Sequence, residues 1–100
     1  MDNLENEFDQ ELRDSIRHAK ALGYNPTRFA EMLNSRGGVP LARHLVQTGE
    51  IQDGLHRLVA LGRHDLTMEA IMLQPKYESL FDYRIRDAAR WRLEQATKPR

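Results

Sequence analysis

The sequence contains no cysteine, which excludes disulfide bonds, thiol nucleophiles and thiolate metal ligands. No apolar run approaches the ~20 residues that a membrane-spanning helix needs, and no stretch alternates apolar with polar residues as a strand does. The amino-terminal residues MDNLENEFDQEL are acidic and lack the basic-then-apolar pattern of a secretory signal. We therefore expect a cytoplasmic protein with no membrane segment and no β-structure.

The composition is typical of a single globular domain. The chain has 100 residues, of which 40% are hydrophobic and 30% are charged, and a chain of this length can bury a core without metals or disulfides. Its formal net charge is zero but unevenly distributed. Residues 1–14 carry six carboxylates against one arginine, whereas residues 84–100 carry six basic groups against two acidic ones. Terminal helices of opposite charge could attract each other or pair two chains as a homodimer.

Apolar residues recur every three or four positions through most of the chain, which predicts amphipathic helices. The clearest stripe, in the acidic helix expected over residues 2–22, consists of Leu4, Phe8, Leu12, Ile16 and Ala19. Further helices are predicted over residues 26–36, 39–48, 53–61, 68–73 and 83–96, with one helical turn at 75–78 and a frayed tail at 97–100. The expected fold is all-α, a single compact domain of about six short helices spanning residues 1–100.

The segment GLHRLVALGRHDLTMEAIML, residues 54–73, holds two short helices around a brief link, which predicts that both share one core. Either Asp65 or Thr67 can cap the second helix, and Glu69 in its first turn is favoured by the helix dipole. Arg63 can pin the link by hydrogen bonds to Asp65 or Glu69. We read this segment as structural.

Residues 23–93 carry a longer pattern. Its pieces read GYNPTRF, GGV, GLHRLVALGRHDLTME, LF and ARWRL. The segment resembles a small all-helical bacterial module with the approximate pattern GYxPxxF…GGV…GLxxLxxLGRxDLTxE…LF…ARxRL. That module occurs alone or attached to larger proteins, including restriction and mobile-element proteins, and has no established activity. The resemblance implies a helical fold and a bacterial or phage setting of defence or counter-defence, and it implies no chemistry.

Enzymatic chemistry is not expected. None of the histidines, His18, His44, His56 and His64, forms the H-x-x-x-H spacing of a helical zinc site. The serines lack the context of a nucleophile elbow, and no glycine-rich phosphate loop is present. We therefore predict no catalytic residues, no cofactor and no metal.

The last predicted helix carries a candidate protein-binding surface. On a helical wheel Trp91 falls about 120° from Ile85 and beside Arg84, while Tyr83 and Arg90 also point away from the apolar stripe. Tryptophan, tyrosine and arginine are enriched at protein interfaces. Two alternatives remain open for Trp91, which could stack on nucleic-acid bases or pack beneath another helix of the same domain.

These features favour a small non-enzymatic module that inhibits by covering the surface of a protein partner, such as a nuclease or nucleic-acid-binding complex. The acidic first helix offers a second contact, because Glu5, Asp9 and Glu11 could occupy a basic nucleic-acid groove by charge mimicry.

DNA binding is the alternative function. Residues 26–48 read as a helix, a glycine turn and a helix, as in a helix-turn-helix, with Arg43 and Gln47 as candidate DNA contacts. Against this, the second helix begins with apolar residues, and the chain carries no net positive charge to neutralise phosphates.

Overall fold

The computed structural model describes residues 3–48 and 53–98, and these residues form helices without any strand. Six are α-helices: α1 (Asn3–Ala21), α2 (Thr27–Arg36), α3 (Gly38–Val46), α4 (Asp53–Ala60), α5 (Met68–Met72) and α6 (Tyr83–Thr97). Two are short 3-10 helices, η1 (His64–Leu66) and η2 (Pro75–Leu80). The predicted all-α single domain is confirmed.

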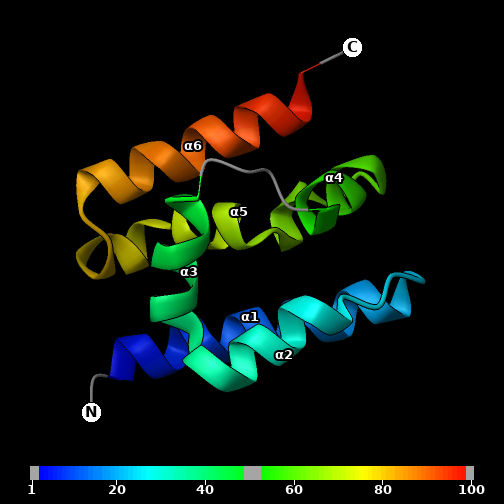
Figure 1. Ribbon diagram of the computed structural model, residues 1–100, viewed down its shortest axis with the longest axis horizontal. Coiled ribbons are helices and arrows are strands. Elements are labelled where there is room, and N and C mark those ends of the chain that lie inside the picture. The colour runs from blue at the N-terminus through cyan, green and yellow to red at the C-terminus, as the bar shows by residue number, and fades with distance from the viewer. Residues whose placement is uncertain (1–2, 49–52, 99–100) are drawn as a thin grey trace.

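The helices lie in two levels that α3 connects (Figure 1). α1 and α2 run along one side of the domain, α6 runs along the opposite side, and α3 crosses between them with α5 behind it (Figure 1). Among the described residues, no ion pair joins α1 to α6, so the expected attraction between the terminal helices is not seen within the part of the chain that the structure describes.

The main core lies where α1, α3, α5, η2 and α6 meet. The α1 stripe predicted from the sequence is confirmed, since Phe8, Leu12 and Ile16 are buried in it and Leu4 packs against its edge. Phe8 makes edge-to-face contacts with Tyr77 and with Phe81, with ring centroids 5.2 Å apart in both pairs. The core therefore joins segments more than sixty residues apart in the sequence.

The predicted common core of residues 54–73 is wrong. Leu58 of α4 packs in a second, smaller cluster with Ala19 and Leu66, whereas Met68 and Ile71 of α5 belong to the main core. Between the two helices in the chain lies η1, an unpredicted helical turn whose Leu66 packs with Leu58 in the smaller cluster.

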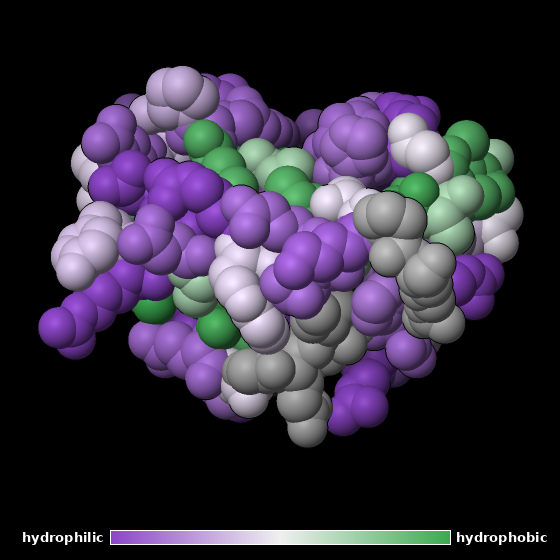
Figure 2. All heavy atoms as spheres, turned by 90° about the horizontal axis from the view of Figure 1, so that it is seen from above, coloured by the Kyte–Doolittle hydropathy of each residue, from purple (hydrophilic) through white to green (hydrophobic). Residues whose placement is uncertain are grey.

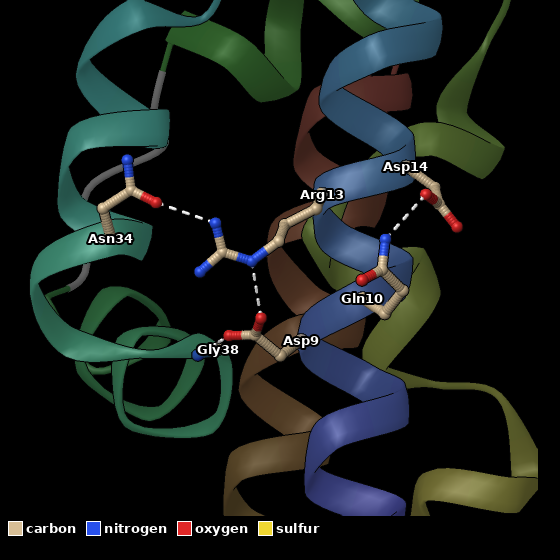
Figure 3. Close-up of polar contacts among 6 residues, drawn as sticks. All are labelled: Asp9, Gln10, Arg13, Asp14, Asn34 and Gly38. Carbon is tan, nitrogen blue, oxygen red and sulfur yellow. Dashed lines mark hydrogen bonds and ion pairs between the residues drawn. The ribbon is translucent and has the colours of Figure 1, made fainter.

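The joint between α2 and α3 is tied to α1 by polar contacts (Figure 3). Asp9 accepts hydrogen bonds from Arg13 Nε at 2.7 Å and from the backbone N–H of Gly38 at 2.9 Å, and Arg13 Nη1 donates to Asn34 at 2.7 Å. A Cβ atom at residue 38 would lie only 3.1 Å from Asp9 Cα and 3.2 Å from the Phe8 ring. Glycine at this position therefore allows α3 to approach α1 closely.

Local sequence signals set most helix ends, with small differences from the prediction. Thr67, rather than Asp65, caps α5 by accepting a hydrogen bond from Ala70 N–H. Gly23 and Gly62 follow α1 and α4 with positive φ, as expected for helix C-termini. The tail was predicted to fray from residue 97, but Thr97 still belongs to α6 and Lys98 is its C-cap. Residues 99–100 of that tail, and residue 2 of the predicted first helix, lie outside the described residues.

Candidate protein-binding surface

The exposed face of α6 brings together four of the predicted contact residues. Tyr83 is 65% exposed and Trp91 is 49% exposed, and Arg84 and Arg90 are exposed beside them. At 100° per residue these four side chains fall within about 120° of the helix circumference. Ile85 and Ala89 occupy the opposite, buried face. Trp91 therefore does not pack beneath another helix, and the four residues form one surface, which we call the α6 face.

Two features fix the orientation of this helix. At its start, the Asp82 side chain accepts a hydrogen bond from the backbone N–H of Ile85 at 3.0 Å, as an N-cap does. In its middle, Arg92 Nε donates to Glu69 Oε2 of α5 at 2.8 Å, and both side chains are almost completely buried. Because Arg92 follows Trp91 directly, the ion pair holds the α6 face toward solvent.

The Glu69–Arg92 ion pair is not predicted from the sequence. The sequence predicts instead that Glu69 interacts favourably with the helix dipole and can accept a hydrogen bond from Arg63. Arg63 instead pairs only with Asp65 among the described residues, at 3.0 Å. The sequence does contain a signal that Arg92 is buried, because Arg92 lies about 20° from Ile85 on the helical wheel, inside the apolar stripe. A charged residue in the middle of a buried stripe needs a buried partner of opposite charge.

The α6 face is less basic than the sequence suggests. Arg92 is buried, so it adds no charge to the surface, and Arg90 forms an ion pair with Asp87 on the same helix. For Arg84, no ion pair is found within residues 3–48 and 53–98. Seen from above, on the side of α6, the molecule is mostly hydrophilic, with apolar side chains gathered in a central notch and at one end (Figure 2).

The acidic contact residues of α1 have different environments. Glu5 is exposed. Asp9 accepts a hydrogen bond from the backbone N–H of Gly38 at the start of α3. Glu11 accepts hydrogen bonds from Tyr77 Oη at 2.7 Å and from Gln74, and it forms an ion pair with Lys76 Nζ at 3.1 Å. Two of the three carboxylates proposed for charge mimicry are therefore occupied by contacts within the fold, and only Glu5 is left for a partner.

The contacts of Glu11 also shift the pKa values of Glu11 and Tyr77. Burial alone would raise the pKa of Glu11, but the hydrogen bonds from Tyr77, Gln74 and Lys76 outweigh it and lower the pKa. Burial, together with the neighbouring Glu11 carboxylate, raises the pKa of Tyr77. This cluster connects α1 to η2 and is structural.

Of the candidate DNA contacts, Arg43 lies on α3 and Gln47 is its C-cap, and α3 differs from a recognition helix in two ways. Six of the nine residues of α3 are buried, and the joint with α2 is the single residue Gly37, shorter than the three to four residues of a helix-turn-helix. Gln47 is exposed, but Arg43 Nη2 donates to the backbone carbonyl of Leu80 at 2.8 Å. Both residues are exposed, but one nitrogen of the Arg43 guanidinium is used within the fold.

The four histidines are exposed, and each belongs to a different element. Within the described ranges, no group of three histidine or acidic side chains is placed to hold a metal ion. Nor does any described helix have the length and apolar character needed to cross a bilayer.

Comparisons with protein-family models, curated proteins and solved structures found no match for this chain.

Proposed function

We propose that this protein is a non-enzymatic protein–protein interaction module that binds its partner through the α6 face. The observation behind this proposal is Trp91, a large apolar side chain that is 49% exposed on a helix fixed by a cap and a buried ion pair. A tryptophan on a rigid helix buries a large area on binding and loses little conformational entropy, which is why tryptophan is frequent among interface hot spots.

The chemistry of the face indicates what kind of partner surface it fits. Trp91 and Tyr83 require apolar pockets, and Arg84 requires a carboxylate or another acceptor at the rim. The setting of bacterial or phage defence, with a nuclease or nucleic-acid-binding complex as the partner, is supported only by the sequence resemblance of residues 23–93. The proposed absence of catalysis is supported only by the lack of catalytic motifs in the sequence.

The test is a pull-down from the native host with the tagged full chain, followed by calorimetric titration of the purified partner. Trp91→Ala should weaken binding by tenfold or more, the loss typical of an interface hot spot. Leu61→Ala is the matched control, because Leu61, which directly follows α4, is a similarly exposed apolar residue, 43% exposed. It should change the affinity by less than twofold.

Both variants should unfold at the wild-type urea concentration, so that a loss of binding cannot be attributed to a loss of structure. A partner that binds Trp91→Ala as tightly as the wild type would contradict the proposal.

A further inference from the structure

The exposed side of α6 carries acidic as well as basic side chains. Asp87 and Glu94 are exposed, and on the helical wheel both fall inside the arc that runs from Arg90 to Arg84. Arg90 forms an ion pair with Asp87 on the same helix, whereas neither Arg84 nor Glu94 forms an ion pair with another described residue. This side of the helix therefore carries one acidic and one basic group that the described part of the fold does not pair.

The order of these charges along the helix is complementary to itself. From its start, α6 presents Arg84, Asp87, Arg90 and Glu94, which alternate basic and acidic. When a second copy packs antiparallel across a twofold axis between residues 88 and 89, position 87 of one copy faces position 90 of the other, and positions 83 and 84 face the turn that contains position 94. Arg90 then meets Asp87 of the second copy, and Glu94 meets Arg84 and the hydroxyl group of Tyr83. The symmetry makes each of these contacts occur twice.

The same arrangement covers Trp91. Trp91 and Arg84 lie on the same side of the helix, about 20° apart on the wheel. The twofold axis places that side of one copy beside the same side of the other, with the indole ring and the Arg84 guanidinium of the second copy about 3 Å apart along the helix axis. A guanidinium on an indole ring is a favourable contact, and the covered apolar area adds to it. The exposed side of α6 is accessible to a second copy, because the helix runs along one side of the domain and contacts α3, α4 and α5 with its other side (Figure 1).

We propose that two copies of this chain pair antiparallel through the α6 face and the two carboxylates within it, and that this dimer covers the surface that the protein partner needs. The second part rests on the proposed function. A second copy places all four charged groups against opposite charges, whereas an acidic or a basic surface would place two of them against like charges. A helix of 15 residues is only about 22 Å long, so the interface is small and the dimer should dissociate at micromolar concentrations.

The first measurement follows Trp91, which is the one tryptophan of the chain. Its emission maximum should shift to shorter wavelength as the concentration of the full chain rises from roughly 1 to 300 µM, because dimerisation removes the indole ring from water. Sedimentation equilibrium over the same range should change from one chain to two chains per particle. A chain that stays monomeric, or that dimerises without a change in the emission of Trp91, would overturn the arrangement.

The second measurement tests which positions face each other. In Arg90→Asp positions 87 and 90 are both acidic, and in Asp87→Arg both are basic, so each variant should dimerise at least tenfold more weakly than the wild type. An equal mixture of the two variants should form a heterodimer at least as readily as the wild type forms its dimer, because opposite charges meet again. A mixture that stays monomeric would overturn the assigned pairing.

Arg17→Asp is the matched control for Arg90→Asp. Arg17 forms an ion pair with Asp14 at the same i,i+3 spacing, but on α1. The substitution therefore makes the same change in net charge and breaks the same kind of pair away from α6, and it should leave dimerisation unchanged. A loss of dimer as large as that of Arg90→Asp would show that net charge, and not the pairing of the two helices, controls the association.

The third measurement separates the dimer from the proposed function. In titrations of the purified partner, the apparent affinity should fall when the concentration of the chain is raised above the dissociation constant of the dimer. Equal apparent affinity below and above that concentration would refute the competition between dimer and partner. A partner that binds Trp91→Ala as tightly as the wild type would contradict the proposed function and the competition, but not the dimer, whereas a monomeric wild-type chain would overturn the dimer and not the binding of a partner.

Discussion

Removing one member of the Glu69–Arg92 pair should destabilise the domain strongly. In Arg92→Met the side-chain volume is largely kept, but the Glu69 carboxylate stays buried without the guanidinium that lies 2.8 Å from it. Breaking a buried ion pair from one side costs about 3–5 kcal/mol. Because small domains are stable by only about 5–15 kcal/mol, this single change should remove a large part of the total stability.

The free energy of unfolding would be measured by urea titration, followed by circular dichroism at 222 nm. We expect Arg92→Met to lower it by about 3–5 kcal/mol, and to lower the melting temperature by at least roughly 12 °C, given about 4–8 °C per kcal/mol for a domain of this size. The double variant Glu69→Leu/Arg92→Met should recover most of the loss, because two well-packed apolar side chains often replace a buried ion pair without cost.

Arg90→Met is the matched control. Arg90 lies two residues before Arg92 on the same helix, but its ion pair with Asp87 is exposed to solvent, so its loss should cost less than about 1 kcal/mol. The reasoning is refuted if Arg92→Met is as stable as Arg90→Met, or if the double variant Glu69→Leu/Arg92→Met is no more stable than Arg92→Met.

Two further predictions concern the contacts of α1. The lowered pKa of Glu11 means that its ionised form stabilises the fold above its ordinary pKa of 4.5, and that this contribution is lost as the pH falls through the lower folded value. Glu11→Gln should therefore be less stable than wild type in urea titrations at pH 7, and the difference should shrink at pH 3; a difference independent of pH would contradict this. Gly38→Ala should cost about 1–3 kcal/mol, because the added methyl group would press on Asp9 Cα and the Phe8 ring. A urea midpoint equal to that of wild type would show that α3 can move away from α1 without penalty.

The sequence by itself determined the elements that depend on near neighbours. The α1 stripe, the N-cap of α6 at Asp82 and the helix end before Gly62 follow from side-chain spacing, capping and positive φ, which act within a few residues. The orientation of Trp91 also followed from the sequence, since the side of a helix on which a residue lies is set by its distance from Ile85 along the chain. Local periodicity was therefore sufficient to predict the all-α class and the side of the last helix on which Trp91 lies, but the tertiary structure decided that no other helix covers Trp91.

The tertiary structure alone decided which polar groups meet. Asp9 and Glu11 looked like free acidic side chains, but they reach partners 29 and 66 residues away, at Gly38 and Tyr77. Glu69 likewise finds Arg92 across 23 residues. Sequence periodicity predicts on which face of a helix a residue lies, but it does not predict which other helix that face contacts. The contact depends on how all the helices pack around a shared core. The charges that the sequence assigned to a partner were in part charges that hold the fold together.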